Sequence, residues 1–197
     1  MVVCIRKSVL IISLILLVIV GGICTHFGIR RFYRQHYPTP YAEIVTKYAA
    51  EYEIDPLFVY AVMKTESDFD PNAVSEADAR GLTQVAETTF DWIKGKLQEE
   101  DTVFSDLFDP EVSIRYGTYF LHYLYEEFGS YEMAAAAYHA GRGAVNEWVD
   151  DPSLSHDGES LHTIPSEKTA HYVHKVMQAY EKYTSLYPDG ILPADQK

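Results

Sequence analysis

The sequence predicts a mainly α-helical domain that is preceded by one N-terminal transmembrane helix. Residues 8–29 contain no charged side chain, apolar residues recur at helical spacing through most of the remaining chain, and two Asp-Pro pairs mark helix starts. No alternating apolar and polar run of useful strand length is present, although a small hairpin within a loop stays open. A chain of 197 residues fits one domain with an appendage.

The apolar segment 8–29 is long enough to span a membrane. As a helix, its 22 residues would extend over roughly 33 Å, about the thickness of a bilayer core. It has no amphipathic stripe of the kind that a buried helix in a soluble protein needs. We therefore expect an uncleaved signal anchor, with residues 1–7 as a short cytoplasmic tail. Residues 30–40 are predicted to be a juxtamembrane linker, in which Pro38 and Pro40 interrupt any helix.

Cleavage and orientation of this segment stay open. A cleavable signal peptide is the main alternative, and the stretch from Gly21 to Cys24 resembles a lipoprotein box but lacks a small residue before the cysteine. Both flanks are basic, and charge by itself slightly favours a cytoplasmic position for the domain. The basic residues are Arg6 and Lys7 before the segment and Arg30, Arg31 and Arg34 after it. The second cysteine, Cys4, also lies beside the segment, so no disulfide is expected in the domain.

The domain is expected to extend over residues 41–187, followed by a C-terminal tail, 188–197. Its first helix is predicted at 41–54, and Asp55 resembles an N-cap with Pro56 at the first helical position of the next helix. That helix runs to Ser67. A loop at 70–82 and a weaker helix at 87–98, interrupted by a glycine, come next.

The second half of the domain repeats these signals. Asp109 and Pro110 start a helix that stops at Gly129, and Ser130 can cap the next one. Four consecutive alanines in that helix permit close approach of a neighbour, so we expect it to be the central buried helix. Helices are predicted at 111–128, 131–140, 143–149 and 171–187, with a polar loop at 150–167.

The charge distribution argues against nucleic acid as a partner. The first 40 residues hold five of the 16 basic residues and no acid, so the following 157 residues carry 11 basic and 29 acidic side chains, a balance of −18. Such a domain repels a polyanion. Any grip on an anionic polymer must therefore come from shape, hydrogen bonds and stacking.

Four motifs carry a resemblance to a known family. The first is Glu66 and Ser67 followed by Phe69, Pro71, Ala73 and Ser75; the second is Ala79, Gly81, Leu82 and Gln84. The third is Ala137, Tyr138, Ala140 and Gly141, and the fourth is Thr169, Tyr172 and Val173. In this order and spacing they resemble the lysozyme-like catalytic domain of SLT-type lytic transglycosylases, glycoside hydrolase family 23.

The resemblance implies a lysozyme-like helical fold and cleavage of the MurNAc–GlcNAc β-1,4 bond of peptidoglycan. Glu66 would act as general acid and then as base on the C6 hydroxyl, closing a 1,6-anhydro ring, with no metal and no cofactor. Ser67 and Gln84 would line the cleft, although Gln84 could equally satisfy a loop. Tyr138 and Tyr172 would orient Glu66, with core packing as the alternative role.

Glu66 alone, without the resemblance, would be interpreted as a surface glutamate in the last turn of a helix. A general acid there needs a pKa raised by burial. Glycosidases usually use two carboxylates. No residue pattern marks a second one among the acids nearby, which are Asp68, Asp70, Glu76 and Asp78. One acid favours attack by the sugar's own hydroxyl, which needs no activated water.

The chain departs from the family pattern at several positions. His139 replaces the usual Asn and can charge near neutral pH, so a substrate contact there would make binding pH-dependent. Asp78 stands where Gly is usual, which puts the turn in question. Thr83 replaces the usual Met, and Ala86 with Glu87 replaces a common Met-Pro pair.

Three alternatives remain. One is a hydrolytic muramidase like the goose-type lysozymes, and another is a weakly active peptidoglycan-binding scaffold protein. The third is a metal site built from His156, His162, His171 and His174, which has no HExxH signature; exposed histidines are the favoured interpretation. The expected partners are peptidoglycan glycan strands, the membrane and proteins of the cell-envelope machinery. The function implied by the resemblance places the domain on the extracytoplasmic side, so the expected location is the cell membrane of a bacterial envelope.

Overall fold

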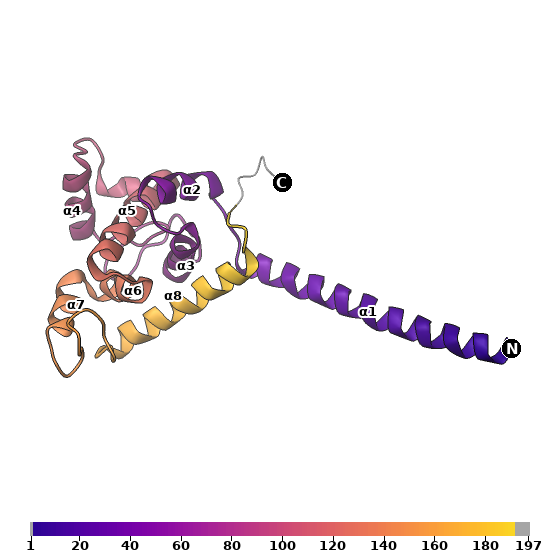
Figure 1. Ribbon diagram of the computed structural model, residues 1–197. Helices are drawn as coiled ribbons and strands as arrows, with labels where there is room; N and C mark the ends of the chain where they lie inside the picture. Colours follow the sequence, from indigo (N-terminus) through magenta and orange to yellow (C-terminus); the bar gives the residue numbers. More distant parts are fainter. Residues whose placement is uncertain (1, 192–197) are drawn as a thin grey trace. The chain divides into compact units, whose positions relative to one another are not determined.

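The structure is a computed structural model that describes residues 2–191, with side chains from Val9 onward (Figure 1). Two compact units follow one another in the chain, Met1–Pro38 and Thr39–Lys197, and each is described by itself. Of the predicted end segments, residue 1 and residues 192–197 lie outside the described part.

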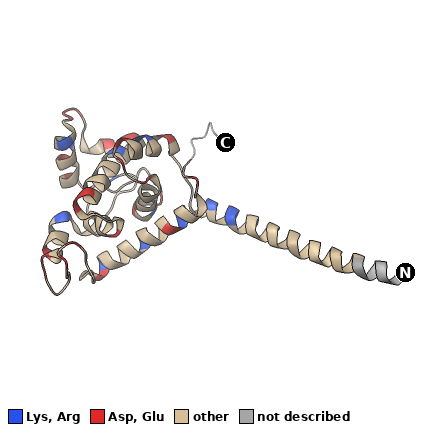
Figure 2. Ribbon diagram, in the orientation of Figure 1, with Lys and Arg blue, Asp and Glu red and all other residues tan. Residues whose placement is uncertain are grey.

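The first unit is a single helix, α1 (Val2–His36). Its stretch Val9–His36 is long and apolar enough to cross a membrane by length and composition. Figure 2 shows no charge along the middle of this helix. The helix continues through residues 30–36, which we predicted as linker, and the Tyr37 amide still bonds to the Tyr33 carbonyl at 2.8 Å. It ends just before Pro38, a residue without an amide hydrogen to donate.

The second unit is an assembly of helices. They are α2 (Ala42–Glu51), α3 (Pro56–Ser67), α4 (Glu87–Leu97), the 3₁₀ helix η1 (Phe104–Phe108), α5 (Pro110–Phe128), α6 (Tyr131–Ala140), α7 (Arg142–Val149) and α8 (Glu167–Leu186). Among the described residues no strand forms, and two isolated β-bridges join Arg80 to Val74 and to Val85. The predicted mainly α-helical class is confirmed. Helix η1 was not predicted, and α8 begins four residues before its predicted start.

Helix ends follow the local signals in the sequence. The Asp55 side chain accepts a hydrogen bond from the Leu57 amide at 2.8 Å, and Asp109 accepts one from the Glu111 amide at 2.8 Å. Both caps satisfy amides that have no partner within the helix. Gly129 ends α5 with φ 73°, a left-handed conformation that suits glycine.

The core is centred on α6, as predicted from its alanines. Ala134 to Ala137 have no exposed surface, and α6 contacts α5, α7 and α8. Small side chains let these helices approach closely. Helix α8 also packs against α3, whose residues Leu57 to Met63 are all buried. Two helices distant in sequence, α3 and α8, are thereby held against each other.

The loop between α3 and α4 is fastened to α5 by Thr83. The Thr83 hydroxyl donates to the Ser113 carbonyl at 2.9 Å, and the Thr83 amide donates to the Ser113 hydroxyl at 3.2 Å. Thr83 is fully buried, and Gly117 of α5 leaves room for its side chain. The threonine that departs from the family pattern therefore has a structural role in this chain.

Replacing Gly117 by alanine should destabilise the domain. The added Cβ would lie 2.5 Å from the Thr83 Cβ, and overpacking of this kind costs about 1–3 kcal/mol. Gly95→Ala in α4 is the matched control, because nothing lies within 4 Å of its added Cβ. Thermal unfolding of the full chain in detergent, followed by near-UV circular dichroism, should give a lower midpoint for Gly117→Ala than for Gly95→Ala. Equal midpoints would contradict the close contact at Thr83.

Candidate active site

Glu66 lies at the C-terminal end of α3, in a half-buried position. The helix ends at Ser67, and the next residue, Asp68, takes up a left-handed conformation with φ 48°. Because α3 is packed in the core, the backbone of Glu66 is held in place. The Glu66 side chain points toward α8.

Tyr172 of α8 is the hydrogen-bond partner of Glu66. Its hydroxyl donates to Glu66 Oε1 at 2.6 Å, and its side chain is 8% exposed. This bond fixes the register between α3 and α8 at one end of α3, and a second bond does so at the other end. There, the Tyr180 hydroxyl donates to Asp55 Oδ2 at 2.7 Å. The two bonds join residues more than 100 positions apart in the chain.

Burial raises the pKa of Glu66 to about 7, and the hydrogen bond from Tyr172 opposes this rise. The pKa values of Tyr172 and Tyr138 are raised well above 10, first by burial and then by the charge of Glu66. Both phenols therefore keep their protons at neutral pH. A carboxyl group with a pKa near 7 can give a proton to a substrate and take one back at that pH.

Tyr138 lies near enough to Glu66 for the charge of Glu66 to affect its pKa, but its hydroxyl does not donate to the Glu66 carboxyl. Its hydroxyl donates to the Thr83 carbonyl at 2.7 Å, which ties the end of α6 to the loop after α3. Of the two tyrosines predicted to orient Glu66, Tyr172 thus contacts the carboxyl directly, while Tyr138 holds the neighbouring backbone. Their roles toward a substrate stay predictions.

Ser67 and Gln84 are engaged in the same loop. The Ser67 hydroxyl donates to the Leu82 carbonyl at 2.8 Å, and Gln84 Nε2 donates to the carbonyls of Ala73 and Gly81, each at 2.9 Å. These bonds give both side chains a structural function. Contact with substrate stays a prediction for the two of them.

His139 lies on the outer side of Tyr172. Its ring stacks on the Tyr172 ring, with centroids 4.5 Å apart and planes at 28°, and its Nδ1 is 3.2 Å from the Thr169 hydroxyl. Burial, together with the charge of Lys168, lowers the pKa of His139. The ring is therefore neutral at pH 7, and the predicted charging lies on the acidic side of neutrality.

The acids near Glu66 in sequence have other partners or face solvent. Asp68 forms an ion pair with Lys64 at 2.8 Å, and Asp70 accepts from the Asn72 amide at 2.9 Å. Glu76 is exposed. No pattern in the sequence marked these residues as partners of Glu66, and the structure gives them solvent-facing positions instead.

Asp78, which stands where the family usually has Gly, adopts the left-handed conformation of the turn. It has φ 57°, the left-handed region, and its two carboxylate oxygens accept from Arg80 Nε and Nη2, each at 3.0 Å. A bidentate ion pair of this kind stabilises the turn. The departure at this position is therefore accommodated without loss of the loop.

A metal centre does not form in the described part of the chain. No group of three or more His, Cys, Asp or Glu side chains comes together there in a way that could hold a metal ion. The rings of His156 and His162 stack at 4.3 Å, while His171 and His174 are exposed on α8.

Sequence analysis missed two contributors to the site. The bond between Tyr180 and Asp55 sets the register of α3 and α8, although Asp55 was identified only as a helix cap. The second is Thr83, whose carbonyl receives Tyr138. Its signal was the departure from the family pattern itself, together with Gly117, the residue that makes space for it.

Comparison with known proteins gives consistent matches. The soluble lytic murein transglycosylase of Salmonella typhimurium is 30% identical over 159 residues, which cover 76% of this chain and 23% of that protein. The membrane-bound lytic murein transglycosylase C of Yersinia pestis is 33% identical over 165 residues, covering 73% of this chain and 46% of that protein. This chain therefore spans less than half the length of either relative.

The fold matches as well. The crystal structure of the 70 kDa soluble lytic transglycosylase from Escherichia coli aligns with a TM-score of 0.72 and 25% identity, over 83% of this chain and 27% of that one. This likeness confirms the predicted lysozyme-like helical domain. Residues 43–157 match the family described as the transglycosylase SLT domain. With Glu66 and its neighbours in place, the chain belongs to the transglycosylase SLT domain family.

Proposed function

We propose that this chain is a membrane-anchored lytic transglycosylase. It cleaves the MurNAc–GlcNAc β-1,4 bond of peptidoglycan without water and leaves 1,6-anhydro-MurNAc ends. Family membership and the two murein transglycosylase relatives support this reaction. The observation that carries the proposal is Glu66, a carboxyl group with its pKa raised to about 7 and a hydroxyl donor at 2.6 Å.

The first step needs Glu66 in its protonated form. Its proton passes to the glycosidic oxygen as the bond from that oxygen to the anomeric carbon of MurNAc breaks. The leaving sugar departs as an alcohol, and positive charge develops on the MurNAc ring. Glu66 becomes a carboxylate at this moment, and the Tyr172 hydroxyl already donates to Oε1. A bond to the charged form stabilises that form, so the proton transfer becomes more favourable.

In the second step Glu66 acts as the base. The C6 hydroxyl of the same MurNAc attacks the anomeric carbon and gives its proton to Glu66, which closes the anhydro ring and restores the starting protonation state. The attacking oxygen is part of the substrate, so attack benefits from a high effective concentration. One carboxyl group thus serves both steps, which agrees with the solvent-facing positions of Asp68, Asp70 and Glu76.

A hydrolytic muramidase differs only in the attacking group. Water would take the place of the C6 hydroxyl, and reducing ends would form. A binding or scaffold protein would retain peptidoglycan without cutting it. Product analysis separates all three, because the anhydro product is lighter than the hydrolytic one by one water and a scaffold gives neither.

We further propose that α1 is a single membrane span with the domain on the extracytoplasmic side. The length and apolar composition of Val9–His36 support the span, and the membrane-bound name of the Yersinia relative agrees with it. An extracytoplasmic domain faces the proposed substrate. Proteins of the cell-envelope machinery are partners that this location would permit.

Glu66→Gln should abolish turnover. General acid–base catalysis contributes about 10²- to 10⁴-fold, and glutamine can neither give nor take the proton. Muropeptide release from purified peptidoglycan by the full chain in detergent, analysed by chromatography and mass spectrometry, should fall at least about 10²-fold. Glu76→Gln, at an exposed acid nearby, is the control and should retain wild-type rates with anhydro products. Wild-type rates from the Glu66→Gln chain would remove Glu66 from the mechanism.

The pH profile should respond to Tyr172→Phe. Since the first step needs protonated Glu66, kcat/KM should fall as pH rises through the Glu66 pKa, about 7. The Tyr172 hydroxyl lowers that pKa, so its removal should move the alkaline limb to higher pH and reduce the maximal rate about tenfold. Tyr180→Phe likewise removes a hydroxyl of α8, the one that donates to Asp55 at the start of α3, and should leave the limb in place. A limb that stays unchanged in Tyr172→Phe would show that Glu66 does not set it.

Protease accessibility tests the proposed orientation. Protease added to intact bacteria that express the chain should digest the domain from residue 39 onward while a cytoplasmic marker survives. Detergent-permeabilised cells provide the control in which both are digested. A domain that survives in intact cells, while a known exterior protein is degraded, would place it on the cytoplasmic side.

A further inference from the structure

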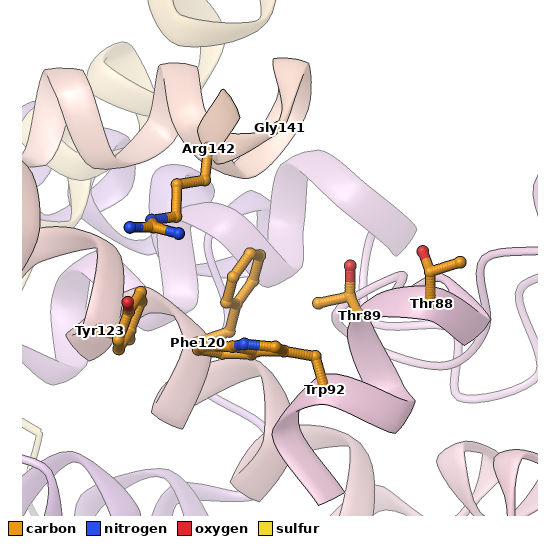
Figure 3. A pocket seen from close by; sticks show the side chains of 7 residues that line it. All are labelled: Thr88, Thr89, Trp92, Phe120, Tyr123, Gly141 and Arg142. Carbon is orange, nitrogen blue, oxygen red and sulfur yellow. The ribbon is translucent and has the colours of Figure 1, made fainter. Parts of the chain in front are cut away.

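A pocket of about 300 Å³ lies between the first turns of α4, the middle of α5 and the start of α7 (Figure 3). Trp92 and Tyr123 meet edge to face, with ring centroids 4.6 Å apart, and Phe120 lies 5.9 Å from Trp92. Thr89 adds a hydroxyl-bearing side chain to the lining. The pocket has the mixture of flat apolar walls and few polar groups that is typical of ligand sites.

The pocket adjoins the surroundings of Glu66. The Phe120 ring, which lines it, contacts the Tyr138 ring with centroids 5.3 Å apart. Tyr138 in turn donates to the Thr83 carbonyl, and its pKa is raised in part by the charge of Glu66. Phe120 and Tyr138 therefore connect the lining of the pocket to the surroundings of Glu66.

Arg142 brings a cation to the lining of the pocket, and Lys96, which is outside the lining, contacts the Trp92 ring. The Arg142 guanidinium carbon is 5.8 Å from the Tyr123 ring centroid, and Lys96 Nζ is 5.5 Å from the Trp92 ring centroid. The unit from residue 39 onward holds only 11 basic residues against 29 acidic ones. Arg142, although it is paired with Glu127, is thus a rare cation in a strongly negative domain and is the lining group that suits an anionic ligand group.

Arg142 is held in a fixed position. Its Nε donates to both carboxylate oxygens of Glu127, at 2.7 and 2.5 Å, and Asn146 donates to the same carboxylate at 3.0 Å. Among the described residues only Nε takes part in these bonds, so the two terminal nitrogens are available. A guanidinium with two such nitrogens matches a carboxylate in a bidentate geometry. Figure 3 shows the guanidinium near the Tyr123 ring, with Phe120 beside it.

We propose that this pocket binds a carboxylate of the peptide stem attached to the glycan strand, with Arg142 as its anchor and Trp92 as its apolar wall. This inference rests on the proposed function, since it names a further part of the same polymer. While the peptide is attached, the lactyl carboxyl of MurNAc is amide-linked and uncharged, so the free carboxylates of such a strand belong to the amino acids of the stem. Arg142 is therefore a specificity-determining residue for strands that keep their peptides.

The test compares peptidoglycan with free carboxylates and the same material after conversion of its carboxylates to methylamides. Full chain in detergent is used with both substrates, and release of anhydro ends is measured. Arg142→Gln should lower the rate on untreated material about tenfold, the size of a lost charge-assisted bond. Masking the carboxylates should lower the wild-type rate by a similar factor, so that the two proteins converge. Arg142→Lys, which keeps the charge, should lie between them.

Lys47→Gln is the matched control. Lys47 is 56% exposed and paired with Glu111, as Arg142 is 53% exposed and paired with Glu127, but it lies on α2, outside the pocket. This variant should follow the wild type on both substrates. The inference is overturned if Arg142→Gln loses the same factor on both substrates, which would assign Arg142 to the sugar or to folding. No loss on either substrate also overturns it.

Binding without cleavage separates this inference from the proposed function. In the Glu66→Gln background, co-sedimentation with insoluble peptidoglycan should weaken when Arg142→Gln is added, and only for untreated material. If the wild type forms no anhydro ends, the proposed reaction is wrong, and the sedimentation difference still decides the pocket. If the Glu66→Gln chain and the chain with both substitutions sediment equally with untreated material, the carboxylate site is overturned.

Discussion

The contact between α3 and α8 is the constraint on which the site depends. Two tyrosine hydroxyls of α8 donate to two carboxylates of the α3 segment, Tyr180 to Asp55 at its start and Tyr172 to Glu66 at its end. The same packing removes Glu66 from water, which raises its pKa to about 7. Position, partner and protonation of the acid thus have one origin, because the helix that supplies the hydroxyl also excludes the solvent.

The loop after α3 is the second element of this arrangement. Leu82 receives the Ser67 hydroxyl from α3, and Thr83 is bonded to Ser113 of α5 and to Tyr138 of α6. Three helices are joined to a short backbone segment beside the acid. Buried polar groups that all have partners hold one geometry, since any shift would leave a donor or acceptor unsatisfied. The departures from the family pattern at Asp78 and Thr83 are compatible with this loop because each has a partner of its own.

Electrostatics divides the domain into two kinds of surface. Most of it is acidic and would repel a polyanion. The aromatic pocket between α4, α5 and α7 carries Arg142, and Glu127 keeps the guanidinium in place. Within a negative domain, a local cation orients an anionic group of the ligand more than it increases the overall affinity for the ligand. The acid at Glu66 and the cation at Arg142 thereby serve different parts of one proposed substrate.

The sequence by itself determined the helical fold, most helix ends and the identity of Glu66. Caps such as Asp55, Asp109 and Ser130 act on amides two or three residues away, so their effect is visible in the local sequence. The motifs likewise named Tyr138 and Tyr172. The helical extent of residues 30–36 and the 3₁₀ helix η1 were missed, because short-range signals there were weak or pointed to prolines further on.

Only the tertiary structure decided what those residues do to one another. That Tyr172 contacts Glu66 while Tyr138 contacts Thr83, that Gln84 is engaged by its own loop, and that Arg142 faces an aromatic pocket all depend on contacts between distant segments. The burial of Glu66, and therefore its raised pKa, also depends on contacts between distant segments. The local sequence does not predict how much water a neighbouring helix excludes. Local sequence signals specify the helices. Burial of side chains and hydrogen bonds between helices specify the site.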